Sequence, residues 1–222
     1  LTIPKAKSNL VLEGAGPRGA VFVTPVAAGA KPLIVHADDV TILNLGLETN
    51  GAGTALEFYG TRLRVYESKI EGGALAVKAT KGTNAQIIAA THGTGSDFLF
   101  EDCELAWTTD AVELAATDYG AVTQGHFRRC LLHGFTGRGF KSSGPSSGIR
   151  FRDLWLEDCE FGNGEDGTEP TFWVDLNPGD VEIWYNTGRR SGCRFPGVVA
   201  SAKVVTAAKM VRSGNFYTNG HD

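Results

Sequence analysis

Carboxylate side chains recur at comparable places in short segments where apolar and polar residues alternate. Glu57, Glu113 and Asp175 stand in three such segments, and Lys141 stands in a fourth. Because successive side chains of an extended strand point to opposite faces, we expect all four on the face turned away from the core. Two carboxyl groups held roughly 6.5–9.5 Å apart can hydrolyse a glycosidic bond with inversion. We therefore predict Glu113, Glu57, Asp175 and Lys141 as candidate catalytic residues.

The same outward face carries aromatic and further polar side chains. Trp173 and Tyr59 offer rings on which the apolar face of a sugar can stack, and Lys78 offers hydrogen-bond donors. Asp110 and Asp118 lie in the predicted loops beside these segments. We predict these five as substrate-binding residues. The expected outward column reads Glu57, Ala76, Glu113, Lys141 and Trp173, with Tyr59, Lys78 and Asp175 alongside.

Other patterns of catalytic or metal-binding residues are weaker. The five histidines lack the spacing of metal ligands and are interpreted as surface or loop residues. The oxygen-rich segment 162–169 is a calcium candidate, but a solvated turn is the favoured interpretation. We predict no cofactor and no metal.

The candidate residues belong to a repeat that averages about 28 residues. An apolar anchor marks each unit, and a second apolar residue follows five positions later in the first five units. Three of the four cysteines stand three positions after an anchor. The anchors are Ile42, Val65, Phe100, Phe127, Leu156, Ile183 and Met210. One register that aligns all these columns predicts strands stacked on the equivalent strands of neighbouring units.

Each unit is expected to contain three short strands. Segments 98–101 and 103–105 read as two strands separated by a bend at Asp102, and Asn44 and Asp158 occupy the same bend in their units. Asn and Asp tolerate the left-handed conformation that such a bend needs. A third strand precedes each pair, at 33–35, 55–58, 74–77, 111–114 and 171–174. Irregular segments are expected near 81–94 and 198–208.

Segments 40–45, 100–105 and 156–161, with the opening run 1–16, resemble the right-handed parallel β-helix of pectate-lyase-like proteins and bacteriophage tailspikes. The resemblance implies an all-β chain that forms one right-handed, single-stranded parallel β-helix, a solenoid of about seven to eight coils over residues 1–222. An entry coil is expected at 1–32, regular coils at 33–197 and a terminal coil at 198–222. A β-sandwich or jelly roll is the alternative fold, but it does not explain why the cysteines share one register.

Two shorter resemblances concern activity. Segment 138–143 is similar to the lysine-bearing strand of chondroitinase-B-like and alginate lyases, which implies Lys141 as the base of an elimination. Segment 95–100 is similar to part of a pectin esterase. The other motifs of those families do not accompany either segment, so a glycoside hydrolase is favoured over a polysaccharide lyase.

The cysteine column, Cys103, Cys130 and Cys159, is expected to point into the core as reduced, inert thiols. A disulfide or a thiolate metal site is the alternative, although parallel in-register side chains do not offer the disulfide dihedral. Cys193 stands outside the column and is interpreted as a packing residue. Reduced thiols favour folding in a reducing compartment, as during assembly inside a bacterial host.

The amino-acid composition of the chain excludes some classes of binding partner. Twenty-nine glycines in 222 residues are about double the average share of roughly 7%, and many of them fall between the predicted strands. A net charge of −4 lacks the basic excess that nucleic-acid binding needs. No apolar stretch reaches the roughly 20 residues of a membrane span, so we expect no membrane insertion. The start at Leu1 and the single methionine, Met210, suggest part of a longer chain.

Two functions follow from the predicted ladder. The first is a polysaccharide-binding module, with or without cleavage, that holds its substrate on the outward face of the stacked strands in a phage tailspike or an extracellular carbohydrate-active protein. The second is a non-catalytic structural module of a virion fibre, spike or decoration protein. The resemblance to tailspikes implies a homotrimer, or contacts with other virion proteins, and a virion or extracellular location.

Overall fold

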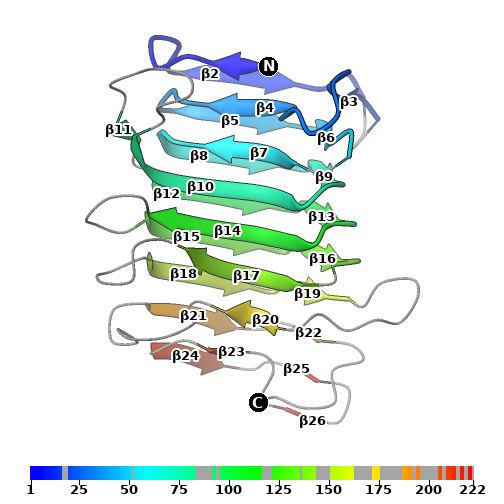
Figure 1. Ribbon diagram of the computed structural model, residues 1–222. Coiled ribbons are helices and arrows are strands. Elements are labelled where there is room, and N and C mark those ends of the chain that lie inside the picture. Colours follow the sequence, from blue (N-terminus) through cyan, green and yellow to red (C-terminus); the bar gives the residue numbers. More distant parts are fainter. Residues whose placement is uncertain are drawn as a thin grey trace.

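The chain is built from short strands arranged in three stacked sheets (Figure 1). The computed structural model describes residues 1–16, 20–51, 53–83, 92–93, 96–116, 122–135, 137–143, 151–162, 172–175, 187–191, 194–195, 205–206, 209–213, 216–217 and 220–221. Within these ranges all regular structure is β-strand. The same ranges contain no helix with the length and apolar character of a membrane span.

Sheet A consists of β1 (Thr2–Ile3), β4 (Leu33–Val35), β7 (Thr54–Phe58), β10 (Leu75–Thr83), β14 (Asp110–Ala116), β17 (Arg138–Ser143), β20 (Phe172–Asp175) and β23 (Val205–Thr206), with β11 (His92–Gly93) paired to β10. Sheet B consists of β2 (Leu10–Glu13), β5 (Val40–Leu43), β8 (Thr61–Tyr66), β12 (Ser96–Glu101), β15 (Val122–Arg128), β18 (Phe151–Glu157), β21 (Thr187–Ser191) and β24 (Lys209–Ser213). Sheet C consists of β3 (Phe22–Val23), β6 (Gly46–Glu48), β9 (Lys69–Glu71), β13 (Glu104–Ala106), β16 (Leu131–His133), β19 (Glu160–Phe161), β22 (Arg194–Phe195), β25 (Phe216–Tyr217) and β26 (Gly220–His221).

The chain visits sheets A, B and C in turn, and each strand lies parallel to the equivalent strand one round later. The antiparallel exceptions among the described pairs are β10 with β11 and β25 with β26. Figure 1 shows the rounds stacked in sequence order from the N-terminus to the C-terminus. These parallel sheets, stacked in register, have the architecture that the sequence predicts for an all-β solenoid.

The predicted register is confirmed over the first five anchors and is wrong for the last two. In sheet B the anchors pair directly in the order Ile42, Val65, Phe100, Phe127 and Leu156. Leu156, however, pairs with Arg190, which pairs with Arg212. Met210 lies two residues from that column, and Ile183 lies outside the described residues. The sequence signal fails here because these last strands place arginine where earlier strands place an apolar anchor.

Aromatic side chains fill the interior where sheets A and B face each other. Phe100 stacks on Phe127 with a centroid distance of 4.9 Å, and Phe127 meets Phe140 of sheet A edge to face at 4.8 Å. Phe98 packs edge to face on Phe127 as well. A Cβ atom on Gly125, the residue paired with Phe98, would lie 2.5 Å from the Phe98 ring, so glycine leaves the space that this ring occupies.

A left-handed residue makes the bend that follows each of the sheet B strands β5, β8, β12, β15 and β18. The predicted bend residues Asn44, Asp102 and Asp158 have φ of 54°, 55° and 51°, which confirms them. Glu67 and Arg129 occupy the equivalent bends at 47° and 49°, although this conformation costs such residues about 1–2 kcal/mol. The cost is offset because their N–H groups continue the ladder, to the carbonyl oxygens of Glu101 and Glu157.

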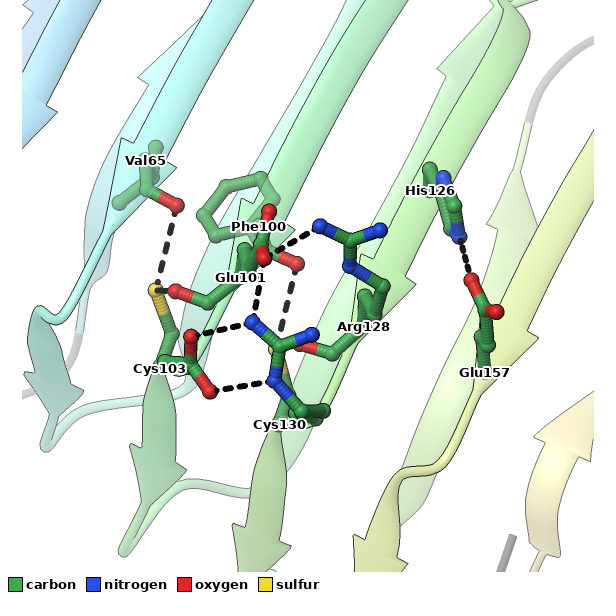
Figure 2. Close-up of polar contacts among 10 residues, drawn as sticks. Val65, Phe100, Glu101, Cys103, His126, Arg128, Cys130 and Glu157 are labelled. Atoms are coloured by element: carbon green, nitrogen blue, oxygen red, sulfur yellow. Dashed lines mark hydrogen bonds and ion pairs between the residues drawn. The ribbon is translucent and has the colours of Figure 1, made fainter. Parts of the chain in front are cut away.

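The cysteine column lies inside, as predicted. Cys103, Cys130 and Cys159 are buried free thiols whose Sγ atoms lie 3.3–3.5 Å from backbone carbonyl oxygens of their own and the preceding round. Figure 2 shows these contacts for Cys103 and Cys130. Burial, reinforced by the two neighbouring thiols, raises the pKa of Cys130 well above its usual value. These three thiols are therefore packed, unreactive core groups. Cys193 lies outside the described residues.

Candidate functional site

The predicted ladder of charges exists on sheet A, but its membership differs from the expectation. Glu57 pairs with Lys78, Lys78 with Glu113, Glu113 with Lys141, and Lys141 with Asp175. The predicted column contained Ala76 and Trp173 in place of Lys78 and Asp175, which is wrong by two residues in each strand. The observed row alternates negative and positive charges from β7 to β20, so its charged neighbours in adjacent strands are of opposite sign.

Glu57 is not exposed, contrary to the prediction that it lies open on the outward face. Only 3% of its surface is accessible. Its Oε1 accepts a 2.7 Å hydrogen bond from the Tyr59 hydroxyl, and its Oε2 forms an ion pair with Lys31. Both carboxylate oxygens are thus engaged by the protein. Glu57 therefore stabilises this part of the solenoid and offers no free oxygen to a substrate.

Tyr59 is likewise buried, although it was predicted to bind substrate on an open face. Its ring stacks on His36 at a centroid distance of 4.8 Å. Burial, together with the bond to Glu57, raises the pKa of Tyr59 above its usual value. His36, interpreted from the sequence as a surface or loop residue, is only 2% exposed, and neither ring nitrogen has a hydrogen-bond partner in the described part of the chain. Burial lowers the pKa of His36, and the nearby Glu57 carboxylate opposes that shift.

The remaining predicted residues divide into three groups. Lys78 and Glu113 are partly exposed and form an ion pair with an Nζ–Oε2 distance of 3.6 Å. Asp110, predicted to lie in an open loop, instead begins β14 and is buried. The structure places Lys141, Asp175 and Trp173 in strands of sheet A without describing their side chains, and Asp118 lies outside the described residues.

The outward face of sheet B, in contrast, is open. A pocket of about 280 Å³ lies there and crosses four neighbouring strands, β8, β12, β15 and β18. Its lining combines an indole, an imidazole, a guanidinium, a carboxylate and an amide with apolar surface. The lining residues are Arg64, Asp97, Phe98, Leu99, Gln124, Gly125, His126 and Trp155. A few polar groups around an apolar floor are typical of a small-molecule site.

Trp155 provides the largest exposed apolar surface of this pocket. It is 42% exposed, and its ring meets the His126 ring at 68° and 5.5 Å between centroids. His126 Nε2 lies 3.1 Å from Glu157 Oε2, as Figure 2 shows. The imidazole is thus held between an indole and a carboxylate, so its position and that of the indole are set before any ligand arrives.

Arg64 is fixed on the opposite side of the pocket. One of its Nη atoms donates a 2.7 Å hydrogen bond to the Asp97 backbone oxygen, and the other donates a 2.8 Å bond to Asp97 Oδ1. Asp97 itself adopts a left-handed conformation with φ of 54°, as does Gln124 at 59° in the next round. These tight bends bring the Asp97 and Gln124 side chains to the edge of the sheet B face.

A network of ion pairs lies beside this pocket. Glu101 bonds to both Arg128 and Arg129, and Arg129 also bonds to Asp102 (Figure 2). The Arg128 bond, with that of Arg129, lowers the pKa of the Glu101 carboxyl below its usual value. Because these charges satisfy one another across adjacent rounds, the network holds strands together rather than presenting a charge to a ligand.

Sheet C carries a related but smaller arrangement. Trp107, 40% exposed, meets His133 edge to face at 5.1 Å, and His133 Nε2 lies 3.1 Å from Glu104 Oε1. Lys69 also reaches Glu104, at 3.4 Å. Trp107 lines neither the pocket beside Trp155 nor the pocket beside Thr41. The same three residue types thus occur on two faces, and the sheet B set differs in that its indole and imidazole line the pocket of about 280 Å³.

Sequence reasoning missed the sheet B site. The alternation in Leu154, Trp155 and Leu156 would have placed the indole outward, and the paired anchors Phe127 and Leu156 would have put His126 beside it. The spacing of the histidines alone does not reveal the pair, because Trp155 lies one round further along the chain. Asp97 and Gln124 carry no such pattern, since each interrupts the alternation of its own strand with a left-handed residue.

No group of three or more His, Cys, Asp or Glu side chains able to hold a metal occurs among the described residues. The calcium candidate, apart from Gly162, lies outside those residues. Comparison of the chain with protein-family models, with curated proteins and with solved structures found no match.

Proposed function

We propose that this chain is a polysaccharide-binding module, a right-handed parallel β-helix of seven to eight coils, and that it binds sugar on the outward face of sheet B. The observation that carries the proposal is the pocket of about 280 Å³ that contains the exposed indole of Trp155. An indole face complements the apolar face of a pyranose ring, and the surrounding polar groups complement its hydroxyls.

The polar groups are suited to hydroxyl recognition. Asp97 and Gln124 supply acceptors, and the free N–H groups of Arg64 and Gln124 supply donors. Because Arg64 and His126 are already held by Asp97 and Glu157, they lose little conformational entropy on binding. Binding rather than cleavage is what this arrangement favours. Within the predicted catalytic set, the two glutamates have salt-bridge partners in the protein.

Trp155→Ala tests the proposal, with Trp107→Ala as the matched control. Both indoles are exposed to a similar extent and both contact a histidine, but only Trp155 lines the pocket. We expect a glycan array to identify a neutral or acidic bacterial polysaccharide as ligand. Trp155→Ala should weaken its affinity at least tenfold, about 1.4 kcal/mol, in isothermal titration calorimetry, whereas Trp107→Ala should leave it unchanged.

Absence of binding to any glycan by the complete protein would refute the proposal. Equal losses in the two variants would show that the effect is not specific to the sheet B pocket. Circular dichroism of both variants should match that of the wild type, since each substitution removes an exposed ring.

A specific observation also favours the structural module. Exposed apolar side chains occur in or directly before β1, β2 and β3, the strands at one end of the three sheets, and in the loop after β3. They are Leu1, Val11, Val21, Phe22 and Val26. Exposed apolar clusters are typical of surfaces that contact another protein. In that case we propose a homotrimer of a virion or extracellular protein. Light scattering should give a trimer mass, and Val26→Asp should lower it; a monomer at all concentrations would contradict this alternative.

A further inference from the structure

A second pocket continues the first along sheet B. It has a volume of about 350 Å³ and is lined by Asn9, Val11, Asp39, Thr41, Arg62 and Arg64, with Leu10 between the first two. Arg64 therefore lines both pockets, with its side chain 30% exposed between them. The two hollows are halves of one groove, which we call the sheet B groove.

The groove runs across the strands, along the axis of the solenoid. Its floor is a single row of outward residues that pair strand by strand: Val11, Thr41, Arg64, Leu99, His126 and Trp155. Five steps at the strand spacing of about 4.8 Å make it about 24 Å long. One pyranose unit is close to that spacing in length, so successive sugars of a chain would meet equivalent positions of successive rounds.

Charges in the groove are balanced. Arg62 forms a two-point ion pair with Asp39, and Arg64 pairs with Asp97, so two guanidinium groups are matched by two carboxylates. The pair with Arg62 lowers the pKa of Asp39, which keeps that carboxylate ionised and the balance intact at neutral pH. A groove with paired charges can donate hydrogen bonds to sugar hydroxyls and accept hydrogen bonds from them. It has no excess positive charge that would attract a polyanion.

The two ends of the groove differ in chemistry. The end near β18 has the indole and imidazole of Trp155 and His126, which suit ring stacking. The end near β2 has Asn9, Thr41 and the Arg62–Asp39 pair, which suit hydrogen bonding to hydroxyls. Such asymmetry gives a bound polymer a preferred direction.

We propose that the ligand of the sheet B groove is an uncharged linear glycan that lies along the solenoid axis, with a stacked sugar on Trp155 and further sugars over Arg64 and Thr41. The inference rests on the proposed function and adds the polymer's direction, minimum length and charge. Affinity therefore rises with chain length until the oligosaccharide reaches from Trp155 to Thr41.

Calorimetry on the complete protein tests length and charge together. The probes are size-defined cello-, malto-, xylo- and manno-oligosaccharides, from disaccharide to octasaccharide, with oligogalacturonides as the charged series. We expect one neutral series to gain at least tenfold in affinity between the disaccharide and the hexasaccharide, and no oligogalacturonide to bind more tightly.

Thr41→Arg separates this inference from the proposed function. It places a long side chain in the pocket at the β2 end of the groove. The control, Leu43→Arg, puts the same side chain on the next outward position of β5, outside both pockets. Thr41→Arg should reduce the affinity for the hexasaccharide about tenfold and leave that for the disaccharide unchanged. Leu43→Arg should change neither, and Trp155→Ala should weaken both.

Each outcome is decisive. If affinity does not depend on length and Thr41→Arg has no effect while Trp155→Ala removes binding, the extended groove is wrong and the sugar-binding pocket stands. Tighter binding of oligogalacturonides would overturn the assignment of an uncharged ligand. If none of the oligosaccharides binds, the inference is overturned together with the proposed function.

Discussion

Sheets A and B each turn a row of paired side chains outward, yet the two rows differ in how accessible their residues are. On sheet A, Glu57 is 3% exposed and is held by Lys31 and Tyr59. On sheet B, Trp155 is 42% exposed and borders a pocket. Outward direction is a property of the strand, whereas accessibility depends on what lies over the strand. A charged residue on the outer face of a solenoid is therefore not by itself a site residue.

The largest expected effect tests whether Glu57 is structural. Glu57→Ala leaves the Tyr59 hydroxyl buried without its acceptor and Lys31 without its partner, so we expect a loss of about 2–4 kcal/mol in the free energy of unfolding. Glu113→Gln, on a partly exposed residue of the same row, should lose less than about 1 kcal/mol. Urea denaturation followed by circular dichroism measures both. Similar losses would remove the distinction between a closed and an open part of sheet A.

Gly125→Ala tests the floor beneath the open face of sheet B. The added methyl group would lie 2.5 Å from the Phe98 ring, so the ring must shift within a packed core. We expect a loss of about 1–3 kcal/mol in the free energy of unfolding. The affinity for a ligand in the sheet B pocket should also fall, because Phe98 and Gly125 both line that pocket. A variant of unchanged stability would show that the core under sheet B is loosely packed.

His36, which follows β4 of sheet A, makes folding stability depend on pH. Burial lowers the pKa of His36 in the folded state, so the unfolded chain takes up a proton first as pH falls below about 6.5. Folding stability contributed by the neutral ring is thus present above that pH and decreases as the solution is acidified. The difference between the urea midpoints at neutral and at mildly acidic pH should be smaller in His36→Phe than in the wild type. An equal acid sensitivity in that variant would assign the effect to other groups.

The smallest effect concerns the partly exposed section of the ladder. Lys78→Met removes the 3.6 Å ion pair with Glu113 and should change the free energy of unfolding by no more than about 0.5 kcal/mol. A loss as large as that of Glu57→Ala would mean that the whole row acts as one buried network. The same urea measurements decide this.

Much of the fold could be predicted from the sequence because its signals are local and repeated. The apolar columns at Phe100 and Leu105 pair as expected, Asp102 makes its bend, and Cys103 points inward. The prediction fails where the local signal weakens, as in the last rounds, where Arg190 and Arg212 take the anchor positions. Apolar periodicity cannot mark a register through positions that are not apolar.

The candidate site was predicted less well for a different reason. Alternation correctly assigned Glu57 to the outward face, but its partner Lys31 lies 26 residues away and Tyr59 folds back onto it. The sheet B groove is likewise assembled from residues of six rounds, among them Thr41, Arg64 and Trp155. No pattern within a single repeat predicts that Glu57 is covered. No such pattern predicts that two pockets meet at Arg64.

The sequence by itself determined that this chain is built of stacked strands, which residues face the core, and where Asn44, Asp102 and Asp158 turn the chain. Those features follow from a period of two in side-chain direction and from the conformational tolerance of single residues. Only the tertiary structure decided which outward face is covered and which is open. That outcome depends on contacts between residues far apart in the chain, and such contacts are settled by the packing of the rounds together.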